Sequence, residues 1–414
     1  YWSAFPQLRG SLFASDETPY SQLAVQNVKE AIEGNNDVQA FVAAHHAAFV
    51  DFAAYLDSEL IEKMMELNVS QTEDAITQNI FGRIAPLPLL DRYQAYQLLD
   101  NQWASIATDL EIVQTEGFAA TKQVDPNMVV KKKDDKEEEV QNGWVGHVIP
   151  FDLVQTTLLR KDYDALKGKE ARLDEITEEL TDIINSIDEG DRGDFLNDDN
   201  TSFVAKEFAA KLAEIYGDVS SPELDGLQGY LELLDTKAGK AEKIHYINTH
   251  PEVNWINVNG NFPYGKGKVS AYIKALRAAY IFPEDSFEAK MIQADKLMTE
   301  EKTVKKETKE MSETLHLKTK ETIEGLSDEQ VLDLLRLKWI APLCASLRAM
   351  PGAIIAGLEK EVQTLADKYA VTYLELEEQI QKSEAAIAGM IDELTGSEYD
   401  MKGLSEFQSL LKGE

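Results

Sequence analysis

The sequence predicts a mainly α-helical protein with long, antiparallel, coiled-coil-like helices and one small β or loop element. Apolar residues recur three and four positions apart over most of the 414 residues, which is the spacing of one helix face. Two stretches extend this spacing into long apolar seams of the coiled-coil kind. Only residues 111–150 change to short β-branched runs, and no strand–glycine–helix unit opens the chain. We therefore expect a helical fold without a Rossmann-like core.

The net charge of −33 restricts the classes of partner that the chain can bind alone. A surface this acidic repels a phosphate backbone unless a local basic patch or another protein supplies the contact. The single cysteine, Cys344, excludes a disulfide framework, and no run of about 18 apolar residues predicts a membrane span. We expect a soluble, cytoplasmic protein without a membrane partner. Because Tyr1 is not an initiator Met, we also expect a fragment or a processed chain.

Residues 1–110 form the first predicted region, which is helical. Its most informative stretch is "PLPLLDRYQAYQLLDNQWASI", where the residues that recur at helical spacing are Leu89, Tyr93, Tyr96, Leu99, Trp103 and Ile106. The aromatic residues could form a stacking platform for nucleobases, but the spacing favours the buried face of a helix. Upstream, Ser70 and Glu73 match a capping box and predict a helix start.

Residues 111–150 are predicted to be a charged connector with a small β element. Two β-branched runs flank the block "KKKDDKEEE", in which lysines and carboxylates stand side by side. Opposite charges in this arrangement indicate a solvated loop or hairpin tip and argue against a basic DNA-binding patch.

Residues 151–217 are predicted to be a long helical arm followed by an acidic loop, and residues 218–283 a helix pair with an Asn/Gly/Pro-rich loop. The first seam lies in the arm, on a predicted helix over 151–187, and consists of Leu166, Leu173, Ile176, Leu180, Ile183 and Ile187. Ser221 followed by Pro222 predicts a helix start in the second region. Residues 244–268 are the least helical part of the chain and are expected to form a loop or a small strand pair.

Residues 284–414 are predicted to be long C-terminal helices. A polar helix over 284–324 has a narrow apolar stripe at Leu297, Val304, Met311 and Leu315, and a capping box at Ser327 and Gln330 opens the next helix. The second seam, over 357–395, consists of Leu358, Val362, Leu365, Tyr369, Thr372, Leu376, Ile380, Ser383, Ile387, Met390 and Leu394. Each seam is too narrow to bury itself, so we expect the two to form an antiparallel hairpin arm or to bind partner helices. The residues of both seams are the candidate interaction residues.

No motif predicts an active site. The six histidines lack metal-ligand spacing, the acidic loop over 188–199 lacks the calcium-loop order, and Cys344 lies in an apolar helix. One locally basic spot, with Lys266 and Lys268 before a predicted helix, could contact a phosphate, although it matches neither glycine-rich phosphate fingerprint. We therefore expect no catalytic, cofactor-binding or metal-binding residue in this chain.

Several segments in order resemble one family over nearly the whole chain. "PLLDRYQAYQLLDNQW", "KWIAPLCASLRAMPGAIIAGL", "ADKYAVTYLELEEQI" and "MIDELTGSEYDMKGL" look like the C-terminal helical region of the modification subunit of type I restriction–modification systems. The opening "YWSAFPQLRGSLF" is similar to the segment that follows the catalytic domain in that family.

The resemblance implies an N6-adenine DNA methyltransferase subunit that uses S-adenosylmethionine. The glycine-rich cofactor turn and the Asn-Pro-Pro-Tyr or Phe loop that such enzymes need are both absent from this chain, whose twelve prolines are never adjacent. The cofactor is therefore expected only in the full-length subunit, whose catalytic domain would precede Tyr1. The implied partners are the specificity subunit, with the restriction subunit as a further candidate, and DNA indirectly through the complex. A self-contained coiled-coil scaffold without a link to methylation is the alternative.

Overall fold

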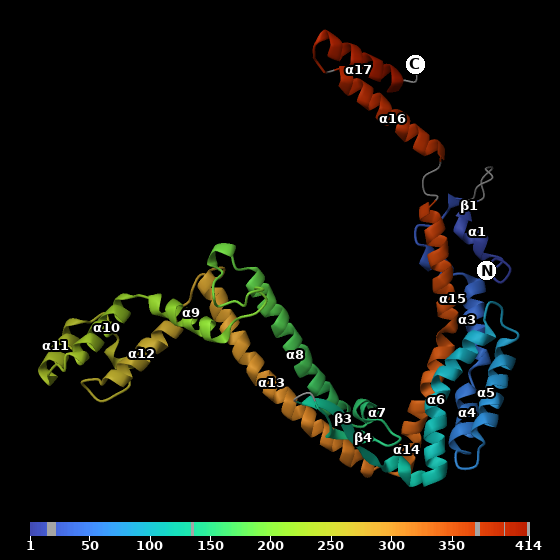
Figure 1. Ribbon diagram of the computed structural model, residues 1–414, viewed down its shortest axis with the longest axis horizontal. Coiled ribbons are helices and arrows are strands. Elements are labelled where there is room, and N and C mark those ends of the chain that lie inside the picture. Colours follow the sequence, from blue (N-terminus) through green and yellow to red (C-terminus); the bar gives the residue numbers. More distant parts are fainter. Residues whose placement is uncertain (15–21, 134–135, 369–372, 393, 412–414) are drawn as a thin grey trace. The chain divides into compact units, whose positions relative to one another are not determined.

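The computed structural model describes residues 1–14, 22–133, 136–368, 373–392 and 394–411, and the chain forms two compact units (Figure 1). Unit 1 comprises Tyr1–Leu153 and Thr322–Glu414, and unit 2 comprises Val154–Glu321. Helices take up 72% of the chain and strands 5%, which confirms the mainly α fold class with a small β element.

Unit 1 is built from short N-terminal helices, two longer helices, a β-hairpin and the C-terminal helices. In chain order its elements are α1 (Leu8–Leu12), β1 (Phe13–Ala14), β2 (Gln22–Leu23), α2 (Val28–Glu33), α3 (Asn36–Ala48), α4 (Phe52–Leu56), η1 (Asp57–Ile61), α5 (Val69–Ile84), α6 (Arg92–Glu116), η2 (Phe118–Lys122), β3 (Val124–Lys133), β4 (Lys136–Gly146), α14 (Asp328–Leu335), η5 (Arg336–Ile340), α15 (Ala341–Lys368), α16 (Tyr373–Asp392) and α17 (Glu398–Leu411). Helix α7 (Phe151–Thr157) and helix α13 (Phe287–Glu324) cross the boundaries of the two units.

Helix α15 is the central helix of the described core of unit 1. It contacts α2, α3 and α6, and its residues Ile355, Leu358 and Val362 are buried among apolar side chains from the N-terminal helices. The run Asp328–Lys368, which contains α15, is also long and apolar enough by length and composition to cross a membrane. One helix of this kind is weak evidence for a membrane span, because the core helix of a soluble protein can pass the same test.

Helix α6 confirms the helical prediction for its segment but corrects the predicted buried face. Leu99 and Trp103 are buried, whereas Tyr93 is 63% exposed. The reason is that α6 begins only at Arg92, after the Asp91 side chain caps the amide of Tyr93. Tyr93 thus lies in the first turn, and the buried stripe starts at Ala95. Tyr93 lies against Phe81 and Arg92, so it is not part of the core.

A π-helical turn, η5, separates α14 from α15, and its cause is readable in the sequence. Pro342 has no amide hydrogen, so the carbonyl of Lys338, four residues earlier, loses its helical donor. Gln102 Nε2 donates to that carbonyl instead, at 2.9 Å. The side chains of the same turn are also anchored, because Lys338 Nζ lies 2.5 Å and Trp339 Nε1 lies 2.7 Å from Oδ2 of the buried Asp109. These bonds fix the start of α15.

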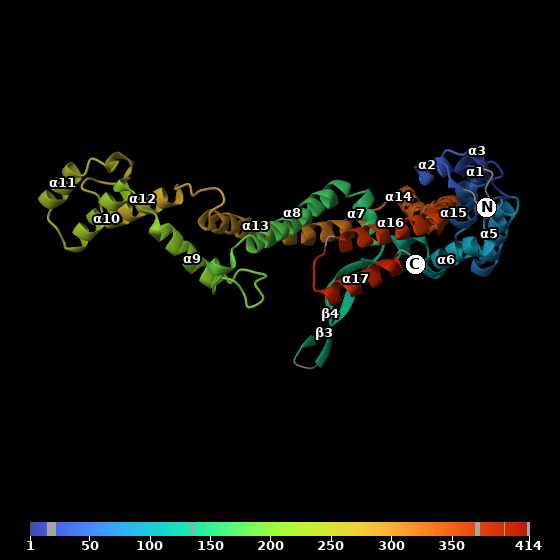
Figure 2. The same ribbon diagram turned by 90° about the horizontal axis from the view of Figure 1, so that it is seen from above.

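The predicted β element is the antiparallel hairpin of β3 and β4, which Figure 2 shows as a two-stranded ribbon. Its register pairs Val124 with Gly146 and Val129 with Val140, with an irregularity between Pro126 and Met128. At the base of the hairpin, His147 Nδ1 lies 2.6 Å from Asp125 Oδ2.

Unit 2 contains a long helix pair and a group of shorter helices. Its elements are α8 (Arg160–Asn185), η3 (Glu189–Asp191), α9 (Ala205–Asp218), α10 (Pro222–Asp235), α11 (Lys240–Thr249), η4 (Trp255–Asn257), α12 (Lys266–Ala278) and most of α13. The single helix predicted over 151–187 is two helices, because the amides of Leu158 and Leu159 both bond the carbonyl of Val154 in a widened turn before α8. The predicted loop over 244–268 is helical up to Thr249.

Three helix starts allow the capping predictions to be compared with the structure. Ser221 caps α10 with Pro222 at its first turn, and Ser327 with Gln330 forms the capping box of α14, both as predicted. The box predicted at Ser70 is wrong, because Asn68 caps α5 by accepting the amide of Gln71. Asparagine is as good a cap as serine and lies two residues earlier, so it sets the helix start.

Candidate interaction surface

The first seam is covered within the chain. Along α8, Leu166 and Ile176 are buried, while Leu173 and Leu180 are half-buried. Ile176 belongs to a core cluster that includes Met291, Ala294 and Leu297 of α13. The partner of the first seam is therefore α13, the polar helix with the narrow stripe, and the predicted hairpin of the two seams is not formed by α8.

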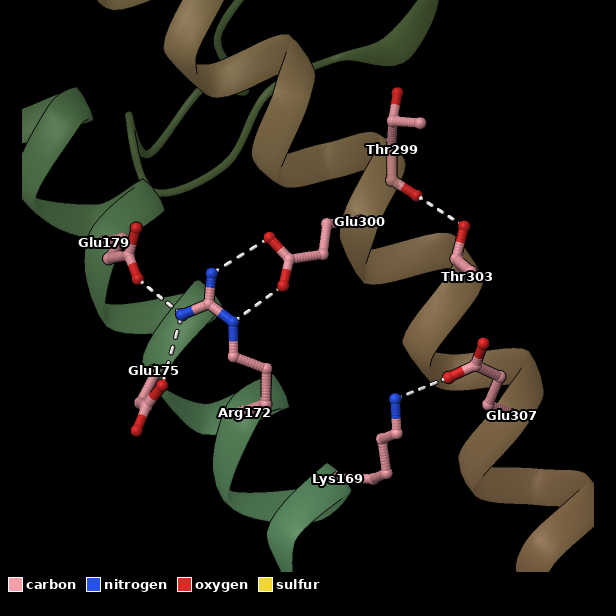
Figure 3. Close-up of polar contacts among 8 residues, drawn as sticks. All are labelled: Lys169, Arg172, Glu175, Glu179, Thr299, Glu300, Thr303 and Glu307. Atoms are coloured by element: carbon pink, nitrogen blue, oxygen red, sulfur yellow. Dashed lines mark hydrogen bonds and ion pairs between the residues drawn. The ribbon is translucent and has the colours of Figure 1, made fainter.

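Charged side chains fix the register of α8 against α13 (Figure 3). Arg172 makes a bidentate pair with Glu300, with Nε and Nη2 at 2.7 and 2.9 Å from the two carboxylate oxygens. Its Nη1 also donates to Glu179 and Glu175 of its own helix, at 2.7 and 3.1 Å. Lys169 Nζ lies 2.7 Å from Glu307 Oε2, about two helical turns after Glu300 along α13. Bidentate pairs add geometric specificity, so this network selects one alignment of the two helices.

The Arg172 network shifts the proton affinities of its members in opposite directions. The hydrogen bonds from Arg172 lower the pKa of the Glu300 carboxyl, and those to Glu300, Glu179 and Glu175 raise the pKa of the Arg172 guanidinium. Both groups are thus charged throughout the physiological range. The network has a structural explanation and needs no catalytic one.

The second seam divides into a covered and an exposed part. Leu358 and Val362 of α15 are buried against the N-terminal helices of unit 1. Leu365, one turn later, is 52% exposed. Tyr369 and Thr372 lie outside the described residues. The seam therefore leaves the core before the end of α15.

Helix α16 exposes its share of the second seam. Leu376 and Ile380 are 50% exposed, Ile387 is 44% exposed, and Leu394, just beyond the helix, is 50% exposed. Met390, between them on the same face, is 67% exposed. Monomeric proteins rarely leave contiguous apolar patches of this kind uncovered. This face of α16, from Leu376 to Leu394, is the candidate interaction surface.

Helix α17 packs against a different face of α16. The buried residues of α16 are Ala388 and Ile391, and Gln408 of α17 donates to the Ala388 carbonyl and to Asp392, at 2.9 and 2.7 Å. Sequence reasoning missed that α17 adds three exposed apolar residues, Tyr399, Met401 and Phe407. These residues are two and six positions apart, which is not the spacing of one helix face, and the hydrophobic content of "EYDMKGLSEFQSLL" was the available signal.

The charge around this surface is strongly negative. Residues 373–411 contain nine Asp and Glu but only two Lys, a net charge of −7 over 39 residues. An apolar stripe with acidic flanks is complementary to a helix with an apolar stripe and basic flanks.

The predicted phosphate contact, Lys266 and Lys268, lies at the start of α12. Both side chains are exposed, and Lys266 Nζ is 2.5 Å from Asp235 Oδ1 at the end of α10. The preceding loop is held by aromatic packing, with Trp255 stacked on Tyr264 at 6.0 Å between ring centroids. Tyr230 OH donates to the Tyr264 carbonyl.

The remaining polar candidates are possible metal ligands, the buried His45 and the single cysteine, Cys344. The described part of the chain contains no group of three His, Cys, Asp or Glu that could hold a metal. His45 is fully buried beside Phe49, and burial lowers its pKa. Burial likewise raises the pKa of the Cys344 thiol, so this cysteine is not an activated nucleophile.

No family model matches the chain, and neither the curated proteins nor the solved structures contain a match.

Proposed function

We propose that this chain is the non-catalytic, helical assembly region of a type I N6-adenine DNA methyltransferase subunit. In this proposal the candidate interaction surface on α16 binds the long helices of the specificity subunit. The observation that carries the proposal is the exposed apolar seam from Leu376 to Leu394, which has coiled-coil spacing but no described partner on that face. The resemblance of the ordered sequence segments supports the choice of family, and the exposed seam supports the choice of contact surface.

The exposed seam is a sufficient source of binding energy for a helical partner. Burying a Leu or Ile side chain fully contributes roughly 1.5–3 kcal/mol. Leu376, Ile380, Ile387 and Leu394 are each about half exposed, so a partner helix can remove a large apolar area from water. Part of that gain offsets the entropy lost on association.

The acidic flanks favour a different protein over a second copy of this chain. Two copies of residues 373–411, each with a net charge of −7, would repel each other across the interface. A specificity-subunit helix with lysines and arginines beside its apolar stripe would be attracted. The acidic flanks therefore argue against self-association of the chain through this seam.

The test is to mix the chain with the matching specificity subunit and to measure the complex by size-exclusion chromatography with light scattering. The interface variant is Leu376→Glu with Ile387→Glu, which places two charges in the seam. The matched control is Ala385→Glu with Gly389→Glu, which adds the same charge on the opposite, exposed face of the same helix, where Gly389 has open space.

We expect the wild type and the control to co-elute with the specificity subunit, and the interface variant to elute alone. Wild-type chain that elutes alone would contradict the proposal. If the wild type alone has twice its monomer mass and the interface variant does not, the seam joins two copies of this chain, and this also contradicts the proposal.

A further inference from the structure

Unit 2 contains a pocket of about 460 Å³ between the end of α9 and the start of α13, which we call the α9–α13 pocket. Three aromatic side chains line it, those of Tyr280, Phe282 and Phe287, together with the buried Ile215 and Val219. Its volume is within the roughly 300–1,000 Å³ of small-ligand sites. The pocket shares no residue with the candidate interaction surface on α16.

The core of unit 2 holds the aromatic walls of this pocket in place. Phe282 packs against both apolar clusters of the unit, and Phe287 lies beside Phe195 with 5.8 Å between the ring centroids. Tyr280 is 48% exposed and makes an edge contact with Phe282, with 4.8 Å between the centroids and 73° between the ring planes. The pocket is therefore lined by rings in different orientations. The faces of such rings carry partial negative charge and attract cations.

The charged side chains that line the pocket are mostly acidic. They are Lys211, Glu214, Asp218 and Glu288. Lys211 Nζ lies 3.0 Å from Glu214 Oε2 and 5.9 Å from the Phe287 ring centroid, so this lysine is neutralised within the chain. Asp218 and Glu288 have no cation within ion-pair distance among the described residues. The pocket thus presents two unpaired carboxylates beside its aromatic walls.

Asp218 lies where the fold gains no stability from a negative charge. It is the last residue of α9, and the dipole of a helix places partial negative charge at its C-terminal end. Arg277 donates to the carbonyl of the adjacent Gly217 at 3.0 Å and forms no ion pair with Asp218. A cation from outside the chain would explain this carboxylate better than a contribution to stability does.

The geometry points to a cation with N–H donors, and we propose that the α9–α13 pocket binds an arginine side chain of a partner protein. A guanidinium group stacks on aromatic faces and pairs with carboxylates through two N–H groups at once. A lysine ammonium is more strongly hydrated, so it would lose more on entering a pocket with aromatic walls. A quaternary ammonium ion suits the rings but has no N–H to donate to Asp218 or Glu288.

An exposed apolar side chain beside the pocket favours a protein over a free guanidinium compound. Ile281 follows Tyr280 directly and is 89% exposed. It offers an apolar contact to the residues on either side of an arginine in a peptide, and free arginine has no such residues. This proposal goes beyond the assembly proposed for α16 and depends on neither that surface nor the choice of family.

The test titrates the full chain with the peptide acetyl-Leu-Arg-Leu-amide and follows binding by saturation-transfer NMR. About 0.1 M salt limits the general attraction of cations to the acidic surface. The same peptide with citrulline, a neutral isostere of arginine, isolates the effect of the charge. The peptide with lysine, free arginine and tetramethylammonium are the competing ligands.

The pocket variant is Asp218→Asn with Tyr280→Ala, which removes one carboxylate and one aromatic wall. The matched control is Asp174→Asn with Tyr399→Ala, which makes the same changes at exposed positions outside the pocket. Circular dichroism melting checks that both variants are folded. Asp218→Asn alone should not lower the melting temperature, because it removes an anion from the C-terminal end of a helix.

We expect the wild type to bind the arginine peptide at least about tenfold more tightly than the citrulline peptide, since a charge-assisted pair and a cation–π contact are lost together. The pocket variant should bind the arginine peptide at least about tenfold more weakly, and the control should stay within about twofold of wild type. Absence of saturation below about 10 mM peptide, equal binding of the arginine and citrulline peptides, or equal weakening in both variants would overturn the proposal. So would tighter binding of the lysine peptide, of free arginine or of tetramethylammonium.

Discussion

The two apolar seams have nearly the same spacing in the sequence but very different surroundings in the structure. On α8, Ile176 is fully buried against α13, and the Arg172–Glu300 pair aligns the two helices. On α16, Ile380 is 50% exposed, and the flanking charges are almost all acidic. The difference teaches that heptad spacing defines which face of a helix is apolar, while the charges beside it indicate whether a partner is already present in the chain.

The largest expected effect comes from making the same truncation in the two seams. Ile176→Ala should lower the free energy of unfolding of unit 2 by about 2–5 kcal/mol, because it leaves a cavity in a packed core. Ile380→Ala should change stability by less than about 0.5 kcal/mol, because the side chain is half in water. Urea denaturation of both variants measures their free energies of unfolding. A similar loss of stability at the two positions would show that this face of α16 is packed in solution.

A second comparison divides the C-terminal seam itself. Leu358→Ala should destabilise unit 1 by about 2–4 kcal/mol, since Leu358 is only 2% exposed among the N-terminal helices. Leu365→Ala, seven residues later, should cost less than about 0.5 kcal/mol, since Leu365 is 52% exposed. Thermal unfolding of the two variants measures the difference between their losses of stability. An equal loss for the two variants would mean that the core continues to the end of α15.

The smallest expected effects are on the pH dependence of stability, where two histidines of unit 1 act in opposite directions. The hydrogen bond to Asp125 and the nearby Glu116 raise the pKa of His147 above its unfolded value of about 6.5. The stabilisation from His147 is therefore complete below pH 6.5 and is lost as the pH rises through the folded pKa. Burial lowers the pKa of His45, so its effect on stability is lost as the pH falls below 6.5.

Melting temperatures measured from pH 5 to pH 8 test these two signs. His147→Gln should lower stability mainly at the acid end of the range and much less at pH 8. His45→Phe keeps a ring beside Phe49 but removes the titrating group, so it should flatten the fall in stability below pH 6.5. Unchanged pH profiles in the variants would show that these histidines have the same pKa in the folded and unfolded chain.

Long periodic segments and local signals allowed much of the fold to be predicted. The helix over 284–324 with its stripe at Leu297, Val304 and Leu315 is confirmed, as are the β element and the caps at Ser221 and Ser327. These features depend on neighbours within a few residues, so the sequence determines them. The same reasoning failed for Tyr93, because burial of an aromatic residue in the first turn depends on what lies across from it.

The charge distribution was determined by the sequence alone, including the −7 of residues 373–411, and so were the long helical segments with their apolar stripes. The tertiary structure decided which apolar faces are covered. Arg172 and Glu300 are 128 positions apart, and no local pattern indicates that α8 pairs with α13. Several apolar stripes of similar spacing could pair with α8. Shape and charge complementarity between helices that are distant in the sequence decide which one does, and this complementarity exists only once the helices are brought together.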